Sequence, residues 1–215
     1  MTKKLAVFDL DGTVLDTLDD LAGALNHALA EYGFPERTSE QVRLAIGGGL
    51  RKMIDRSVPD TVPAEGKEPV FRLFIERYAS HFMDHTRPYE GVPDLLRNLK
   101  NAGMLLALVT NKDARMAEPL CDTFFPGMFD LVVGHAPGLR SKPAPDGVVS
   151  VLNTLSVPAE ETVYIGDSEV DAKTAENAGT DSVIVSWGYR TVCELAEMGI
   201  RDPVPDPETL LSRLL

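Results

Sequence analysis

The sequence has few cysteines, a single tryptophan and no long apolar run, and these shortages exclude several classes of protein. Its 215 residues include two cysteines, Cys121 and Cys193, which lie far apart in the chain. This pattern fits neither a metal-binding spacing nor a disulfide framework, so a reducing, cytoplasmic location is expected. No stretch approaches the roughly 18 uninterrupted apolar residues of a membrane span, and the N-terminus lacks the pattern of a signal peptide.

Positive charge is also scarce. The chain has 21 Lys and Arg residues against 33 Asp and Glu residues, which gives a formal net charge of −12. Bulk charge therefore disfavours binding to nucleic acid or to an anionic membrane. A small anionic molecule remains a possible partner, because a metal ion or one lysine can reverse the local potential. The oligomeric state cannot be read from the sequence.

Short apolar runs alternate with helical patterns over most of the chain, which predicts an α/β fold built on a doubly wound parallel sheet. The predicted strands are 4–9, 104–110, 130–134, 162–167 and 181–186. The predicted helices between them are 92–103, 114–124, 145–155 and 169–179. Gly103 and Gly179 stand where left-handed helix caps are expected.

Residues 15–87 interrupt this alternation. They carry four segments with helical periodicity and no convincing strand, and 58–69 reads as a loop between the third and fourth. The sequence therefore predicts an α/β core formed by 1–14 and 88–215, with a helical cap at 15–87 inserted after the first strand.

Polar side chains follow the predicted strands at their carboxyl ends. In a parallel sheet these ends meet along one edge, where ligands of open α/β sheets bind. The residues concerned are Asp9, Asp11, Thr110, Asn111, Asp167 and, in the loop after the third strand, Lys142. Carboxylate oxygens suit Mg²⁺, which is commonly held by a few carboxylates together with substrate oxygens and water. Asp9 and Asp11, two apart in extended chain, project to the same side.

Four motifs carry a family resemblance. They are DLDGT (9–13), VTN (109–111), KPAP (142–145) and GDSEVD (166–171), in that order along the chain. Together with a helical insert directly after the first motif, they resemble the haloacid dehalogenase superfamily, and within it the phosphoglycolate phosphatase branch. The resemblance extends over essentially the whole chain and implies that superfamily's Rossmann-like core with a cap.

The resemblance implies a role for each acid. Asp9 would be the nucleophile that forms an aspartyl phosphate, and Asp11 would be the general acid and then the general base. Asp9, Asp11 and Asp167 are the expected Mg²⁺ ligands. Gly12, Ser168 and Asp171 are expected to support the site.

Other residues would bind the phosphoryl group. The resemblance gives this role to Thr110, to the backbone of Asn111 and to Lys142, which would neutralise its charge. A structural reading stands beside each role: Thr110 could merely end a strand, and Lys142 could be solvated. Asp171 could close a capping box with Ser168 as the N-cap.

The predicted cap contains a glycine run at 47–49 within IGGGLRK (46–52). This run fits neither the P-loop nor the dinucleotide fingerprint, and it could be a flexible turn. By resemblance it is the cap loop, so Gly48 and Arg51 are expected to bind substrate.

The expected function is Mg²⁺-dependent hydrolysis of a small phosphorylated metabolite, with 2-phosphoglycolate as the first candidate. Pyrophosphatase, nucleotide phosphatase and beta-phosphoglucomutase-like activities remain open on the same core. Asp11 argues against dehalogenation, and Leu21 argues against the mutase because it stands where that family has a cap histidine. The non-enzymatic alternative is a binding module that has kept the fold but does not catalyse a reaction.

Overall fold

The computed structural model describes residues 3–215 and divides the chain into two compact units. One unit comprises Pro88–Leu215 together with the N-terminal segment up to Leu15, and the other comprises Asp16–Arg87. We call them the core unit and the helical unit. The two connections between them pair as a two-stranded sheet of β2 (Leu15–Asp16) and β3 (Arg87–Pro88).

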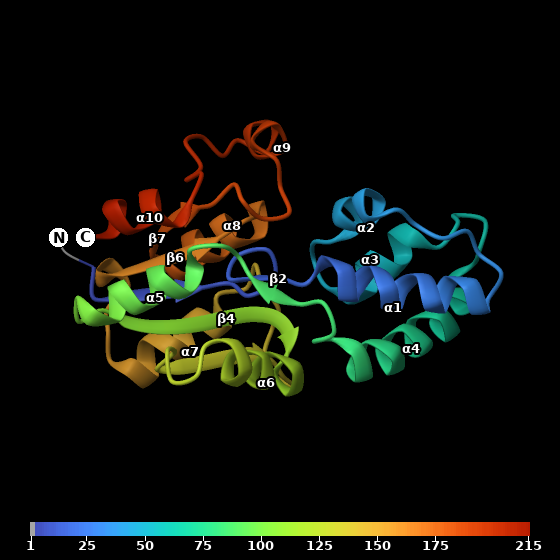
Figure 1. The fold of residues 1–215 in the computed structure, drawn as a ribbon, viewed down its shortest axis with the longest axis horizontal. Coiled ribbons are helices and arrows are strands. Elements are labelled where there is room, and N and C mark those ends of the chain that lie inside the picture. The colour runs from blue at the N-terminus through green and yellow to red at the C-terminus, as the bar shows by residue number, and fades with distance from the viewer. Residues whose placement is uncertain (1–2) are drawn as a thin grey trace. The chain divides into compact units, whose positions relative to one another are not determined.

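The core unit is built on a five-stranded, fully parallel sheet (Figure 1), which confirms the predicted fold class. Its strands, in the spatial order β5-β4-β1-β6-β7, are Leu131–His135, Leu105–Asp113, Leu5–Phe8, Thr162–Gly166 and Asp181–Ile184. The central strands β1 and β6 are buried along their whole length, as expected for a sheet covered on both faces. Because β1 has β4 on one side and β6 on the other, the chain order reverses at β1. The crevice at its carboxyl end is therefore the expected ligand site.

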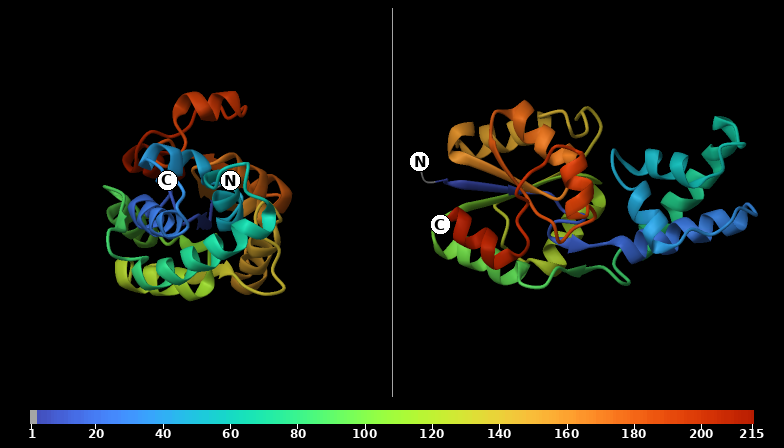
Figure 2. Two further views of the ribbon diagram at one scale, coloured as in Figure 1. Left: turned by 90° about the vertical axis from the view of Figure 1, so that its right-hand side faces the viewer. Right: turned by 90° about the horizontal axis from the view of Figure 1, so that it is seen from above.

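Helices cover both faces of this sheet. The helices of the core unit are α5 (Val92–Asn101), α6 (Ala114–Phe124), α7 (Asp146–Leu155), α8 (Glu169–Ala178), α9 (Val192–Glu197) and α10 (Pro207–Leu214), with a 3₁₀ turn at Ala159–Glu161. The right-hand view of Figure 2 shows α7 and α8, in gold and orange, on one face, and α5 and α10, in green and red, on the other.

Alternation along the strands supplies a separate apolar layer to each face. On the α7 and α8 face, Val7 and Val109 belong to one buried cluster with Val148 and Ala175. On the opposite face, Phe8 contacts Phe129, which in turn contacts Phe125 at the end of α6. The site at the sheet edge is thus held from both sides by packed apolar residues.

The helical unit consists of α1 (Leu18–Glu31), α2 (Ser39–Ala45), α3 (Leu50–Ser57) and α4 (Ala64–His81). Its beginning and end are joined at Asp20, whose carboxylate accepts from the N–H groups of His85 and Thr86 at 2.9 Å each. The hydroxyl of Thr86 donates to the same carboxylate at 2.7 Å. These bonds tie the first turn of α1 to residues 85 and 86, just before the chain returns to the core unit.

The loop predicted at 58–69 is wrong in its second half, because α4 begins at Ala64 and contains Pro69. The proline removes a donor that would have reached the carbonyl of Glu65, and both residues are exposed, so water can serve that carbonyl. Val70, Phe74 and Tyr78 repeat at helical spacing and are fully buried. Their burial outweighs the proline's preference against helix.

Candidate active site

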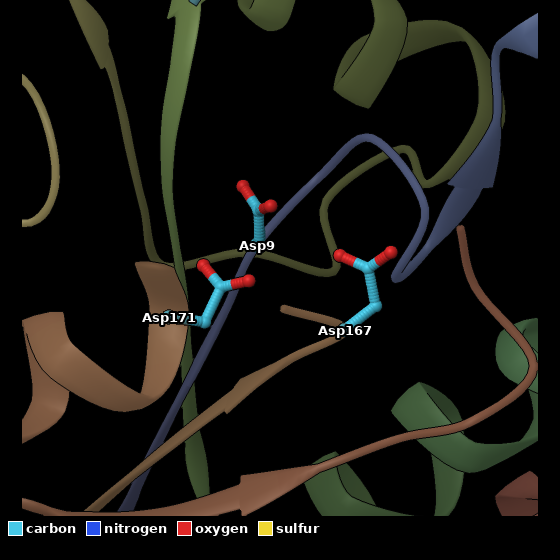
Figure 3. Close-up of side chains that lie close together, drawn as sticks. All are labelled: Asp9, Asp167 and Asp171. Atoms are coloured by element: carbon cyan, nitrogen blue, oxygen red, sulfur yellow. The ribbon is translucent and has the colours of Figure 1, made fainter. Parts of the chain in front are cut away.

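Three carboxylates meet at the carboxyl ends of β1 and β6. Asp9 directly follows β1, Asp167 directly follows β6, and Asp171 lies in the first turn of α8. Each offers an oxygen within 4.8 Å of the others, and all three residues are buried. Figure 3 shows the three carboxylates pointing toward the same side of the strand ends. The sequence prediction brought Asp9 and Asp167 together correctly in space.

Lys142 is the cation of this cluster. Its ammonium group lies 2.7 Å from Asp9 Oδ1 and 2.7 Å from Asp171 Oδ1, and it donates to the hydroxyl of Tyr164 at 3.1 Å. Tyr164 is buried and donates in turn to the carbonyl of Val109 at 2.8 Å. Burial alone would lower the pKa of Lys142, but Asp171 and Asp9 raise it well above its usual range, so the lysine stays charged.

One ammonium group does not balance three buried carboxylates. Burial, the main cause, raises the pKa of Asp9 to about 7 although Lys142 opposes the shift. Burial followed by the charges of Asp171 and Asp9 raises the pKa of Asp167 well above its usual range. An all-oxygen donor set with excess negative charge fits a hard divalent cation, which would offset these costs.

Asp171 has both of its carboxylate oxygens engaged. Oδ1 accepts from Lys142, while Oδ2 accepts from the N–H of Ser168 at 3.1 Å and from its hydroxyl at 2.6 Å. The predicted capping interaction between Ser168 and Asp171 is therefore present. It coexists with the place of Asp171 in the acidic cluster, so the two readings of this residue do not exclude each other.

Asn111 fixes the loop that carries Lys142. Its side-chain oxygen accepts from the N–H of Lys142 at 2.8 Å, and its side-chain nitrogen donates to the carbonyl of Lys142 at 3.2 Å. The hydroxyl oxygen of Thr110 accepts from the N–H of Lys112 at 3.2 Å. Two residues at the end of β4 thus make hydrogen bonds: Asn111 fixes the loop that contains Lys142, and Thr110 bonds to the backbone of Lys112.

Asp11 lies outside the three-carboxylate cluster. Its Oδ1 accepts from the ammonium group of Lys112 at 2.8 Å. Lys112 was not among the residues predicted from the sequence. The signal for it was a lysine two positions after Thr110, in the polar end of a strand that begins with an apolar run.

Two glycines let the chain close tightly around Asp167. Gly12 has φ +84°, and a Cβ there would lie 2.4 Å from Asp167 Oδ2. A Cβ on Gly188 would lie 2.1 Å from the carbonyl oxygen of Gly12. Next to it, the N–H of Tyr189 donates to Asp167 Oδ2 at 2.7 Å, and the indole of Trp187 donates to the carbonyl of Thr13 at 3.0 Å. The segment 187–189, which the sequence analysis missed, therefore supports both the first motif and Asp167.

Comparison with known proteins identifies the family. The model of the haloacid dehalogenase-like hydrolases matches residues 6–185. The chain belongs to the haloacid dehalogenase-like hydrolases. The resemblance inferred from the four motifs is thereby confirmed, and the three-carboxylate cluster agrees with the general use of a divalent metal by phosphatases of this family.

Similar proteins within this family carry phosphatase names. A phosphoglycolate phosphatase of Aquifex aeolicus is 33% identical over 187 residues, which is 86% of each chain. An N-acetylmuramic acid 6-phosphate phosphatase of Pseudomonas aeruginosa is 32% identical over 190 residues, covering 88% of this chain and 84% of the relative. A crystal structure of a candidate phosphoglycolate phosphatase from Lactobacillus delbrueckii subsp. bulgaricus superimposes with a TM-score of 0.95 at 35% identity, covering 100% of this chain and 99% of that one.

The residues predicted to contact substrate from the insert lie in the helical unit of this hydrolase. Gly48, with φ +78°, lies in the loop before α3, and Arg51 lies in the first turn of α3. Arg51 pairs with Glu68 at 2.7 Å, and its guanidinium lies 3.6 Å from the ring centre of Phe71. None of the helices within residues 3–215 combines the length and apolar character needed to cross a bilayer.

Proposed function

We propose that this hydrolase is a Mg²⁺-dependent phosphatase that cleaves small phosphate monoesters, with 2-phosphoglycolate as the first candidate substrate. The observation that carries the proposal is the arrangement around Asp9. A buried carboxylate at the switch point of the sheet lies 2.7 Å from a charged lysine and within 4.8 Å of two further carboxylates. This arrangement supports the proposal, because it would combine a nucleophile, a phosphate-binding cation and a set of metal ligands in one place.

Asp9, Asp167 and Asp171 are the candidate metal ligands by position, and Asp11 was the other candidate from the sequence. Mg²⁺ bound there would neutralise charge on the transferring phosphoryl group. The chain's own residues would do the rest. The N–H of Asp9 donates to the carbonyl of Ile165 at 2.9 Å, which fixes the position of the nucleophile at the sheet edge.

The reaction has two displacements. In the first, a carboxylate oxygen of Asp9 attacks phosphorus, the bond from phosphorus to the leaving oxygen breaks, and Asp11 gives its proton to that oxygen. In the second, Asp11 takes a proton from water as the water oxygen attacks phosphorus. The bond between phosphorus and Asp9 breaks, and inorganic phosphate leaves. The covalent intermediate divides one very slow hydrolysis into two easier steps.

The residues around Asp9 would stabilise the transferring group. Lys142 would pair with its oxygens, because it is charged and already faces Asp9. Thr110 accepts from the N–H of Lys112, which orients its own hydroxyl to donate to a phosphoryl oxygen. Asn111 would contribute its backbone N–H, while its side chain keeps Lys142 in position.

The helical unit is the candidate source of substrate selectivity. Arg51 is held by Glu68 and Phe71, so its guanidinium is partly pre-organised for a second anionic group such as a carboxylate. The names of the relatives support two substrates of this kind, 2-phosphoglycolate and a phosphorylated N-acetylmuramic acid, both of which carry a carboxylate.

The test is phosphate release from a panel of metabolites by the wild type and by Asp9→Asn, with Mg²⁺ and with a chelator. The panel contains 2-phosphoglycolate, N-acetylmuramic acid 6-phosphate, sugar phosphates, nucleoside monophosphates and pyrophosphate. We expect release that requires the metal and is lost in Asp9→Asn. Retained release in Asp9→Asn would refute the covalent mechanism, and no release from any member would refute phosphatase activity.

The same panel distinguishes the alternatives. Preference for pyrophosphate or nucleotides would replace the monoester proposal. Conversion of one sugar phosphate into its isomer without phosphate release would indicate a mutase, which Leu21 disfavours because an apolar side chain stands where the mutases have a cap histidine. Binding of a panel member without turnover would indicate a module that has kept the fold alone.

A further inference from the structure

Lys112 places a second buried ammonium group next to the site. Its side chain is only 2% exposed, and its Nζ lies 2.8 Å from Oδ1 of Asp11, whose side chain is 22% exposed. A buried lysine is costly unless its charge is paired, so its position depends on the carboxylate it meets. The pair connects the end of β4 to the turn after β1, segments that lie 101 positions apart in the sequence.

Lys112 is fixed from its backbone as well as from its side chain. It lies within β4, where its N–H donates to Thr110 Oγ1 at 3.2 Å. On the other side, the turn that carries Asp11 is closed by the bond from the N–H of Gly12 to the carbonyl of Leu15 at 2.9 Å. Both partners of the ion pair therefore stand on hydrogen-bonded backbone, and the Lys112 side chain is buried, so the pair can define the orientation of the Asp11 carboxylate.

The direction of this pairing separates Asp11 from the other acids. Asp9, Asp167 and Asp171 gather within 4.8 Å of one another, whereas Asp11 is turned to Lys112 and does not join them. The ion pair with Lys112 therefore defines where the Asp11 carboxylate lies, apart from the three candidate metal ligands.

We propose that Lys112 is a positioning residue, which holds the Asp11 carboxylate away from the metal ligands and toward the leaving group. The proposal rests on the proposed function, in which Asp11 protonates the leaving oxygen. Lys112 does not itself touch the reacting atoms. Its loss leaves nucleophile, metal ligands and Lys142 in place but removes the orientation of the proton donor.

The experiment compares Lys112→Met with the wild type on two substrates. An alkyl phosphate needs a proton on its leaving oxygen, whereas p-nitrophenyl phosphate releases a stabilised anion without one. The measured quantity is kcat/KM, which reports the steps up to departure of the leaving group. We expect a loss of about 100-fold for the alkyl phosphate, the scale of general acid catalysis, and at most about threefold for p-nitrophenyl phosphate.

A double-mutant cycle tests whether Lys112 acts through Asp11. In the Asp11→Asn background, adding Lys112→Met should change kcat/KM for p-nitrophenyl phosphate and for the alkyl phosphate by less than about twofold, because the group it positions is already removed. The control is Lys100→Met. Lys100, in α5, also pairs with an aspartate of the core unit, Asp130 at 3.2 Å. Asp130 accepts from the N–H of Leu106 near the start of β4, the end of the strand away from Lys112.

Should Lys112→Met fail to fold, Lys112→Gln takes its place, because it keeps an N–H donor without the charge. Equal losses on both substrates, no loss on either, or a further loss in the Asp11→Asn background would each overturn the proposal. Failure of the proposed function looks different, since the wild type itself would then release no phosphate from either substrate.

Discussion

The side-chain amide of Asn111 bonds to both backbone groups of Lys142, accepting from its N–H at 2.8 Å and donating to its carbonyl at 3.2 Å. The lysine loop is therefore set by the neighbouring strand. Replacement by alanine removes both bonds and frees the loop that presents the ammonium group to Asp9. We expect Asn111→Ala to lower kcat about 10- to 100-fold, since displacements near 1 Å have effects of this size.

The matched control for that variant is Asn177→Ala. Asn177 donates to the carbonyl of Pro143 at 2.8 Å, so it touches the same loop through one exposed bond. Its loss should change kcat less than about threefold, because exposed hydrogen bonds contribute little. Equal losses in the two variants would show that the reciprocal bonding of Asn111 has no special role.

Metal should stabilise the fold through the three buried carboxylates. Saturation at about 100 times the dissociation constant adds about 2.7 kcal/mol, which corresponds to a rise in Tm of about 5–10 °C for a chain of this length. Asp167→Asn should abolish this rise. Without metal it should be at least as stable as the wild type, because burial and the neighbouring acids raise the pKa of Asp167 and so disfavour its charge.

Thermal melts with Mg²⁺ and with a chelator measure this effect without an activity assay. Asp202→Asn is the control, because the Asp202 side chain is 88% exposed. A Mg²⁺-dependent rise in Tm that survives in Asp167→Asn would place the metal elsewhere.

Gly12→Ala should destabilise the protein more than an alanine substitution at another glycine with the same positive φ. Gly12 and Gly103 both have φ +84°, but only at Gly12 would a Cβ meet other atoms, the nearest being Asp167 Oδ2 at 2.4 Å. Gly103→Ala should lower the free energy of unfolding by about 1 kcal/mol. Gly12→Ala should lower it by about 2–4 kcal/mol and reduce Mg²⁺ binding, as urea denaturation and titration would measure. Similar values for the two variants would contradict the predicted close approach.

Asp20→Ala should destabilise the helical unit. It removes three hydrogen bonds to His85 and Thr86 and leaves the buried N–H of Thr86 without that acceptor. The expected loss is about 2–4 kcal/mol of unfolding free energy, seen as faster amide exchange in 16–31. Asp19→Ala is the control, because Asp19 shares the first turn of α1 but is exposed. Its effect should stay below about 1 kcal/mol.

Cys121 should resist alkylation in the folded protein. Burial, and then the charges of Asp122, Asp11 and Glu118, raise the pKa of its thiol to about 12. Only about 10⁻⁴ of it is thiolate at pH 8, and the thiolate is the nucleophile. Iodoacetamide at pH 8 should therefore label the exposed Cys193 first and Cys121 only after unfolding.

The raised pKa of Cys121 also makes the free energy of unfolding depend on pH. The unfolded thiol ionises near its ordinary pKa, while the folded thiol stays protonated until about pH 12. Its contribution to stability is thus complete at lower pH and is lost as pH rises from about 9. Cys121→Ala should flatten the decline of stability between pH 8 and 10. An unchanged slope would show that other groups cause it.

The sequence by itself determined what depends on neighbours in the chain. Apolar runs and helical periodicity gave β1, β4, β5, β6 and β7 within a few residues, and Gly179 does cap α8 in a left-handed conformation. Because parallel strands end at one edge, the strand-end acids Asp9 and Asp167 could be placed together before the fold was known. The four motifs then indicated the family without any distance being measured.

Only the tertiary structure decided which side chains meet. The strand order puts β4 beside β1, so Lys112 reaches Asp11, and beside β5, so Asn111 bonds to Lys142 in the loop after β5. It puts β6 on the other side of β1, and Tyr164 of β6 contacts Lys142. None of these pairs has a periodicity or spacing that a single sequence displays. The start of α4 was likewise decided by the burial of Val70, Phe74 and Tyr78, a long-range gain that no local reading of Pro69 could weigh.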